Sequence, residues 1–527
     1  MRYFFIVLCL IFFILALAQA SAQETFAQDA PTSQSVLELP DFYKKDALPL
    51  TLNQVITKTL ENNLQIRISD YDRQIAEAEI NIQKGIFDLM LSAKLSASNN
   101  EFQQPATNFP VSENKKYSGE TTLSQLIPTG GILGFSYKTS RDKTNTFAID
   151  PYYQQGGSLF FRQPLLKNFG SYMTLAGIRI AQNYELMSRE AFRSMVQEQI
   201  AAVTKAYWNL VFAIQYYEVQ RLTLFQAQDF LRIANVSYRT GVIPESEVLQ
   251  AKARVAVQEE HVVIAESAIK ATQDQLKIYM NISRAEKGWD KFYLPIDEPN
   301  VVSIQLDTES FIAAAFKMRP DYLQAQIDLQ NKKINRNTAK NRKLPDLSIV
   351  ASAGRSGLDD SHSGAWDELN TYDYHNYTAG LELEFPLQNR AARFRYKQAV
   401  LQYEKSEEII RNLENIIVLD IRNSVRSLET DQKRVQVTQV AVDAEKAKLD
   451  SEMQRYRVGL STSYNVLEFQ KDYAEALVRH IQSKISFNQD LIELEKAKGT
   501  LLPRFGIVDV PAIQQRLEPV SLDEVQQ

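Results

Sequence analysis

Glycine and proline are scarce in this sequence, and cysteine is almost absent. The 527 residues include 18 glycines, 17 prolines and one cysteine, whereas average proteins hold about 7% glycine and about 5% proline. The cysteine, Cys9, lies in a segment that we expect to be removed, which excludes disulfide and cysteine–zinc chemistry from the mature chain. Lys+Arg 59 against Asp+Glu 64 gives a net charge of −5, so we expect no nucleic-acid partner.

Residues 1–22 have the pattern of a secretory signal peptide. Arg2 precedes an apolar run over 3–18, and small residues at Ala18, Ala20 and Ala22 provide A-x-A cleavage sites. A retained N-terminal anchor helix is the alternative. Beyond residue 22 no apolar stretch reaches 18 uninterrupted residues, so the sequence predicts no transmembrane helix.

Two very long stretches contain neither glycine nor proline. They comprise 63 residues between Gly177 and Gly241 and 72 residues between Pro386 and Gly459. At 1.5 Å per residue these stretches would form helices of about 95 and about 110 Å. Their apolar residues recur at spacings of three and four, as in coiled coils. Shorter clean runs follow each glycine, over 245–287 and 460–498, so the sequence predicts two helical hairpins.

Other stretches alternate apolar and polar residues, which is the period of a β-strand. Four lie within about 89–164 and two within about 347–386: 89–97, 117–126, 132–139, 158–163, 347–353 and 379–385. Such segments are typical of the lipid-exposed strands of membrane barrels, although a sheet with one wet face gives the same alternation.

An acidic, small-residue stretch over 357–368 is expected to be an exposed outer loop that leads into an aromatic girdle with Tyr372, Tyr374 and Tyr377. A calcium site built from Asp359, Asp360 and Asp367 is the alternative to a solvated loop.

The two halves of the sequence match each other at constant offsets. Residues 64–92 overlay 320–348, shifted by 256, and Tyr238-Arg239-Thr240-Gly241-Val242 matches Tyr456-Arg457-Val458-Gly459-Leu460. Each glycine is expected at the tip of a hairpin, where a left-handed turn is cheapest. We therefore predict a first repeat over 47–288 with its tip at 239–242, a second repeat over 303–502 with its tip at 457–461, and a tail over 503–527.

Short motifs in a fixed order resemble those of the TolC-type outer-membrane efflux family, the outer-membrane factors of tripartite efflux and type I secretion systems. They include Leu60-Glu61-Asn62-Asn63, Gly85-Ile86-Phe87-Asp88, Arg162-Gln163-Pro164-Leu165-Leu166, Ala206-Tyr207-Trp208-Asn209-Leu210, Arg319-Pro320-Asp321 and Arg457-Val458-Gly459-Leu460. The resemblance implies an α+β membrane protein that forms a homotrimer. Its β-barrel would lie in outer-membrane lipid and continue as a coiled-coil periplasmic tunnel of two structural repeats per chain.

The implied activity is passive export from an inner-membrane pump reached through a periplasmic adaptor protein. Small-molecule efflux and type I protein secretion use the same architecture, so both stay open, as does a non-conducting periplasmic scaffold. The best-known members contribute four strands per chain, twelve per trimer. Six strands per chain would give eighteen, unless the hairpin that turns at 128–131 folds outside the barrel.

The resemblance also assigns candidate site residues. The tips would dock the adaptor, although plain glycine turns would look the same; the residues are Arg239, Thr240, Gly241, Val242, Arg457, Val458, Gly459, Leu460 and Ser461. Glu247 and Glu468 would ring a channel constriction, weakened because Asn465 replaces one acid; ordinary solvated helix carboxylates are the alternative.

A search for catalytic motifs finds none. No phosphate-binding glycine loop or G-x-S-x-G motif occurs, and the four histidines never have metal-ligand spacing. We therefore expect no enzyme activity, no cofactor and no metal.

Overall fold

The computed structural model describes residues 47–103, 111–144, 150–282, 288–371 and 373–507. The predicted signal peptide over 1–22 and most of the predicted tail over 503–527 lie outside these residues. The first half holds β1 (Ala47–Leu50), α3 (Leu52–Asn62), α4 (Leu64–Lys84), η1 (Gly85–Phe87), β2 (Met90–Gln103), β3 (Val111–Leu126), β4 (Ile132–Thr144), β5 (Tyr152–Pro164), α5 (Ser171–Thr174), α6 (Ala176–Arg239), α7 (Glu245–Tyr279), η2 (Gly288–Asp290) and β6 (Phe292–Pro295).

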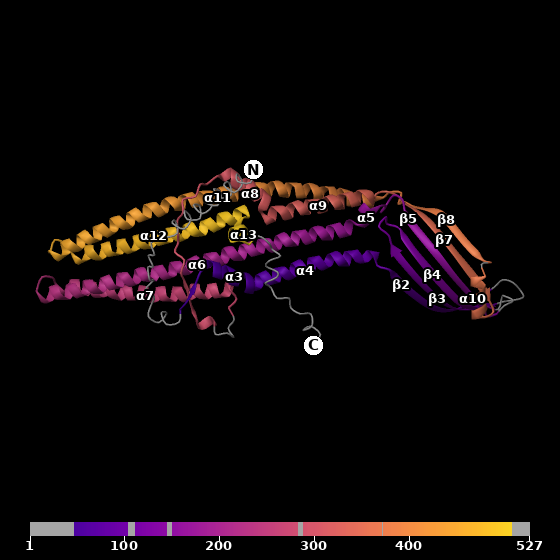
Figure 1. Cartoon of the computed structure of the whole chain (residues 1–527), viewed down its shortest axis with the longest axis horizontal. Helices are drawn as coiled ribbons and strands as arrows, with labels where there is room; N and C mark the ends of the chain where they lie inside the picture. The colour runs from indigo at the N-terminus through magenta and orange to yellow at the C-terminus, as the bar shows by residue number, and fades with distance from the viewer. Residues whose placement is uncertain (1–46, 104–110, 145–149, 283–287, 372, 508–527) are drawn as a thin grey trace, which may run out of the picture. The chain divides into compact units, whose positions relative to one another are not determined.

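The second half repeats the order of helix pair, strands and long hairpin with fewer strands (Figure 1). It comprises α8 (Thr308–Met318), α9 (Pro320–Asn341), β7 (Asp346–Asp359), α10 (His362–Asn370), β8 (His375–Glu384), α11 (Arg390–Arg457), α12 (Ser463–Lys498) and α13 (Leu501–Arg504). No described helix is both long enough and apolar enough to cross a membrane.

The two glycine- and proline-free stretches are helices α6 and α11. They contain 64 and 68 residues, which at 1.5 Å per residue gives lengths of about 96 and about 102 Å. Helix α7 returns along α6, and α12 returns along α11 (Figure 1). Helix α6 also contacts α4, α9 and α12, so it is buried on several sides, whereas much of α11 is exposed.

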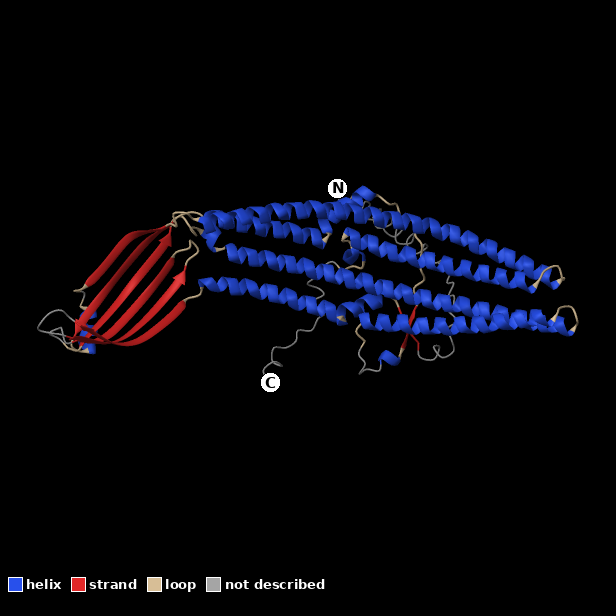
Figure 2. Cartoon of the chain, turned by 180° about the vertical axis from the view of Figure 1, so that it is seen from behind, coloured by secondary structure: helices blue, strands red, loops and turns tan. Residues whose placement is uncertain are grey.

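Six strands form one antiparallel sheet in the order β2-β3-β4-β5-β7-β8 (red in Figure 2). Strand β5 pairs with β7, so the sheet joins the two halves of the chain. The β3–β4 hairpin turns at 128–131 and lies within this sheet, with Leu126 opposite Ile132.

The acidic stretch over 357–368 is not the exposed loop that the sequence predicted. Its first residues complete β7, and helix α10 begins at His362. The Ser361 side chain caps this helix by accepting a hydrogen bond from Gly364 N at 3.0 Å. Asp359 accepts hydrogen bonds from Ser361 N and Oγ, both at 3.0 Å.

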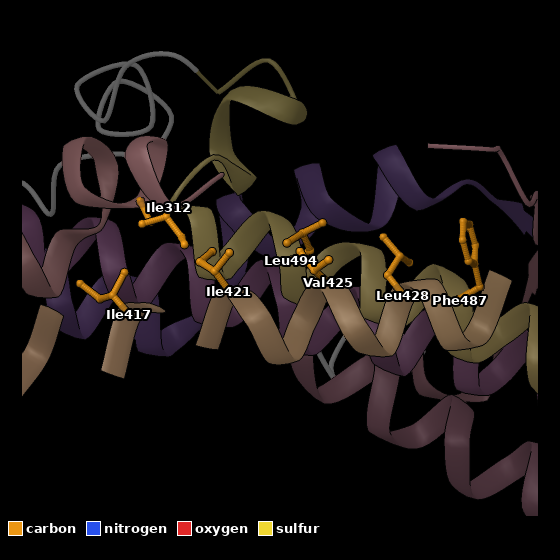
Figure 3. Packing of buried hydrophobic residues seen from close by; sticks show 8 residues of the cluster. Ile312, Ile417, Ile421, Val425, Leu428, Phe487 and Leu494 are labelled. Atoms are coloured by element: carbon orange, nitrogen blue, oxygen red, sulfur yellow. The ribbon is translucent and has the colours of Figure 1, made fainter. Parts of the chain in front are cut away.

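A hydrophobic cluster packs α11 against α12 and α8 (Figure 3). Residues Ile417, Ile421, Val425 and Leu428 recur at spacings of three and four, which places them on one face of α11. Phe487 from α12 completes the contact. The apolar residues whose spacing predicted a coiled coil from the sequence thus form the face that this hairpin buries.

The junctions between the short helices occupy equivalent positions in the two halves. Asn63 ends α3 and caps α4 by accepting hydrogen bonds from the next helix, including one from Gln65 N at 2.9 Å. Arg319, 256 residues later, precedes Pro320, which disfavours helix at this position. Its guanidinium binds Asp321 at 2.7 Å and Asp420 on α11 at 2.9 Å.

A small two-stranded sheet, β1 with β6, ties the start of the described chain to the segment that follows the first hairpin. The Tyr207 hydroxyl on α6 lies 2.6 Å from Asp297 Oδ2 and 3.1 Å from the Leu50 carbonyl oxygen. Asp297 Oδ2 also accepts a hydrogen bond from Leu52 N at 2.6 Å. Burial, and then the hydrogen bond to Asp297, raises the pKa of the Tyr207 hydroxyl.

Candidate functional site: the two hairpin tips

The first tip is a glycine turn that ends α6. Gly241 has φ 74°, in the left-handed region that side chains other than glycine rarely adopt. Gly241 N donates to the Tyr238 carbonyl at 3.0 Å, and Val242 N donates to the Ser237 carbonyl at 2.9 Å. These two bonds form a Schellman motif, which satisfies carbonyls that the helix end leaves free.

The second tip has the same geometry at the equivalent positions. Gly459 has φ 76°; its N–H donates to the Tyr456 carbonyl at 3.0 Å, and Leu460 N donates to the Arg455 carbonyl at 2.8 Å. A side chain built on either glycine would touch no other residue. The two glycines are therefore required by the backbone angle rather than by crowding.

Apolar side chains are exposed at both tips. Val242 is 71% exposed, and Val458 and Leu460 are each 70% exposed. The predicted docking residues Arg239, Thr240, Gly241, Arg457 and Gly459 are exposed too, whereas Ser461 is half-buried. Val242 at the first tip, and Val458 with Leu460 at the second, thus form two small exposed apolar knobs. Arg239 lies beside the first knob and Arg457 beside the second.

The two hairpins contact each other just behind the tips. Phe230 on α6 and Tyr456 on α11 lie with ring centroids 5.0 Å apart. They belong to a buried cluster with Ala234, Ala251 and Val466, which draws on all four long helices. Each tip is therefore held in place by the other hairpin.

Glu247, predicted to line a constriction, is engaged across the hairpins. Its carboxylate accepts a hydrogen bond from the hydroxyl of Ser463, the first residue of α12. Burial raises the pKa of the nearby Tyr456 hydroxyl, and the Glu247 charge raises it further. The acid thus links α7 to α12 instead of standing free in solvent.

Glu468, the second predicted constriction acid, lies among positive charges. Lys471 Nζ lies 3.2 Å from Glu468 Oε1. Across the hairpins on α7, burial lowers the pKa of Arg254, and the Glu468 charge opposes that effect. The negative charge of Glu468 is therefore partly balanced within the chain.

Glu452, a residue that the sequence analysis missed, organises the second tip. This buried carboxylate accepts hydrogen bonds from Ser461 Oγ at 2.5 Å and from Asn465 Nδ2 at 3.4 Å, and pairs with Arg455 at 3.1 Å. The Ser461 hydrogen bond holds the pKa of Glu452 below its usual range. Two of the predicted site residues, Ser461 and Asn465, thus meet at one unpredicted acid.

The histidines do not converge. His480 is buried between α11 and α12, where its Nδ1 lies 3.1 Å from Thr438 Oγ1. No group of three or more His, Asp or Glu side chains within the described ranges is placed to hold a metal ion.

With this geometry in view, comparison with known families assigns the class of protein. A family model described as "Outer membrane efflux protein" matches residues 55–281 and 312–500, which span both hairpins. The chain therefore belongs to the outer membrane efflux protein family, whose members are channels rather than enzymes, and it is a protein of the outer membrane.

Individual relatives are distant. The chain is 22% identical over 61% of its length to the pyoverdine export outer membrane protein OpmQ of Pseudomonas putida, covering 67% of that protein. It is 20% identical over 85% of its length to the probable efflux pump outer membrane protein TtgC of Pseudomonas putida, covering 82% of that protein.

Two solved structures share the fold. The CmeC outer membrane channel of Campylobacter jejuni matches with a TM-score of 0.65 at 16% identity, covering 89% of this chain and 90% of that one. The outer membrane protein VceC of Vibrio cholerae matches with a TM-score of 0.63 at 15% identity, covering 85% of this chain and 96% of that one.

Proposed function

We propose that this chain is the outer-membrane channel of a tripartite export system. Three copies would form a barrel in the membrane and a helical tunnel in the periplasm, and cargo would pass from an inner-membrane pump through a periplasmic adaptor. The observation that carries the proposal is the pair of exposed glycine turns with the same geometry, at the ends of hairpins that begin at a six-stranded antiparallel sheet. The two domains proposed from the sequence each contribute one tip.

Exposed apolar stripes on the helices support assembly from several copies. Leu64, Ile68, Ile75 and Ile82 lie on α4 at intervals of four and seven, and each is more than half exposed. Apolar surface of this extent on a helix marks an interface. The six strands of one chain are also too few to close a transmembrane barrel, which needs at least about eight.

Adaptor docking is proposed at Arg239 to Val242 and Arg457 to Ser461. A variant carrying Val242→Asp and Leu460→Asp places a charge on each apolar knob. We expect adaptor co-purification to fall at least about tenfold, since charges at the core of an interface are strongly disfavoured. Val263→Asp, at a valine of similar exposure far from the tip on α7, is the matched control. Unchanged adaptor recovery with the double variant would contradict tip docking.

The constriction is proposed at Glu247, Asn465 and Glu468. Rings of carboxylates favour cations, and Arg254 and Lys471 oppose that preference here. In single-channel recordings we expect Glu468→Gln to lower cation selectivity and Arg254→Gln to raise it. If neither variant moves the reversal potential, these residues do not line the narrow part of the pathway.

Small-molecule export is the proposed cargo class. The relatives carry names that refer to the export of pyoverdine, toluene and antibiotics. Deleting the gene should raise cellular accumulation of small organic toxins and leave protein secretion intact; the reverse result would favour a type I secretion duct. A purified trimer without any conductance in a planar bilayer would favour a scaffold instead.

A further inference from the structure

The sheet has one apolar and one polar face, and both faces extend across all six strands. One row of register partners, a residue from each strand, is apolar throughout: Leu91, Leu123, Phe135, Leu159, Ala353 and Tyr377. The adjacent row, on the other face, holds Ser92, Thr122, Ser136, Ser158, Gly354 and Asn376. The β3–β4 hairpin therefore carries the same two-faced pattern as the strands on either side of it.

The apolar band runs obliquely to the strands. On β2 it covers residues 91–97, and on β8 it covers 377–383. The register places residue 94 level with residue 374, so the centre of the band moves by six residues over five strand-to-strand steps. A drift of about 4 Å per step at a strand spacing of about 4.8 Å corresponds to a tilt of about 40°, within the range of closed barrels.

Strands β2 and β8 are the two edges of this sheet. Every residue of β8 is exposed, and so is β2 from Met90 to Asn100. All neighbouring strands are antiparallel, so β2 and β8 run in opposite directions and an antiparallel pair between copies is geometrically allowed. Leaving such edges open in lipid would cost several kcal/mol for each unpaired backbone group.

The drift of the band and the charges select one register for that pair. Continuing the same drift brings Lys94 of one copy level with residue 381 of the next, and matching the faces allows only Gly380 or Glu382. Lys94 already faces Glu120, which pairs with Lys138 at 3.1 Å. Glu382, which also pairs with Arg162 of its own chain at 3.4 Å, continues this alternation of charge opposite Lys94, whereas Gly380 carries no charge.

We propose that β2 of one copy pairs with β8 of the next, with Lys94 opposite Glu382, and that all six strands of each chain lie in the barrel wall. The strand number rests on the threefold assembly proposed above and is then eighteen. Eighteen strands spaced about 4.8 Å apart and tilted about 40° enclose a barrel about 36 Å across between backbones, against about 24 Å for twelve. Barrels of this size hold an aqueous channel, so selection among cargoes falls to the helical part.

Cysteine cross-linking tests the register, because Cys9 is the only cysteine of the chain and lies in the predicted signal peptide. Ser98→Cys with Thr378→Cys places one thiol on each edge at directly opposed positions of the proposed pair. Oxidation in outer-membrane fractions should give disulfide-linked dimers and trimers on denaturing gels. We expect at least about five times more product than from Ser92→Cys with Thr378→Cys, whose sites lie six residues apart in register, about 20 Å.

The other outcomes are decisive too. Stronger linkage through Ser96→Cys with Thr378→Cys would overturn the Lys94–Glu382 register. Absence of any cross-link, with trimers and conductance intact in the same membranes, would overturn the β2–β8 pairing alone. If the unsubstituted protein itself forms no trimers and shows no conductance, the proposed function is overturned instead. As a second readout, Lys94→Glu should reduce the resistance of the trimer to heating in detergent. Adding Glu382→Lys should restore part of it, because Glu382 also pairs with Arg162.

Discussion

The ring of Tyr456 on α11 lies 5.0 Å from that of Phe230 on α6, at an interplanar angle of 45°. This contact joins the two hairpins behind their tips, within a cluster that buries Phe230 almost completely. This aromatic pair, with the buried cluster around it, therefore helps to set the spacing between the tips, which any partner that binds both must match.

Removing this ring should loosen the tips. Truncation of a buried phenylalanine costs about 3–5 kcal/mol, so we expect Phe230→Ala to lower the unfolding midpoint and expose both tips to limited proteolysis. Tyr456→Phe keeps the ring and is the matched control. Equal protease resistance of Phe230→Ala and the unsubstituted protein would show that the hairpins hold together without this contact.

The tip glycines should tolerate asparagine better than alanine. Both occupy the left-handed region, which costs residues other than glycine about 1–2 kcal/mol and is least costly for asparagine and aspartate. We expect Gly241→Ala and Gly459→Ala to raise the rate of proteolytic cleavage at the tips severalfold, with the asparagine variants in between. Neither glycine has a close neighbour, so only the backbone angle distinguishes the substitutions. Equal cleavage rates for the alanine and asparagine variants would mean that the residue no longer adopts the left-handed conformation.

Stability should fall between about pH 4 and pH 7 through Asp490. Burial, reinforced by the nearby charge of Asp431, raises the pKa of the Asp490 carboxyl from 3.8 to about 6 in the fold. Lys205 opposes this shift, and Glu493 adds to it. A raised carboxyl pKa stabilises the fold below the ordinary value and loses that contribution as the pH rises through 6.

Asp490→Asn should therefore raise the unfolding midpoint at pH 7.5 and flatten its dependence on pH between 5 and 7.5. Thermal unfolding at both pH values measures this. Asp450→Asn, at an exposed position of α11, should leave the slope as it is. An unchanged slope for Asp490→Asn would assign the pH dependence to another group.

Glu452 should matter more to the second tip than any residue chosen from the sequence. Glu452→Ala leaves the hydrogen-bonding groups of Ser461 and Asn465 without their acceptor. Polar groups that lose a partner destabilise the structure around them, so we expect faster hydrogen exchange at 455–466 and little change at the first tip. Glu445→Ala, on the same helix, is the control. Uniform exchange across both tips would contradict a local role.

The sequence predicted the elements that depend on local chemistry. The long helices follow from stretches without glycine or proline, and the turns at Gly241 and Gly459 follow from the need for a left-handed residue. The alternating segments are strands, each longer than predicted, because pairing extends a strand beyond the residues that alternate clearly.

What the sequence did not predict depends on contacts between distant segments. Helix α10 is held by a hydrogen bond from Gln155 Nε2 on β5 to the His362 carbonyl at 2.8 Å and by the Trp366 ring 5.9 Å from that of Tyr137. The partners of Glu247 and Glu452 likewise come from the return helix α12 or the turn before it. One sequence feature could have indicated Glu452: it lies four residues before Tyr456, on the same buried face of α11.

The hydrogen bonds that join Tyr207 to Asp297 and Leu50 constrain the order in which the chain can fold. Its components lie at residues 50–52, 207 and 297, so a chain that emerges N-terminus first must deliver more than half its length before they can meet. Until then Asp297 cannot bond residues 50–52 and Tyr207 together beside the first hairpin. A chain cut short before residue 297 would carry a complete first hairpin but would lack the Asp297 carboxylate that bonds both Leu52 and Tyr207.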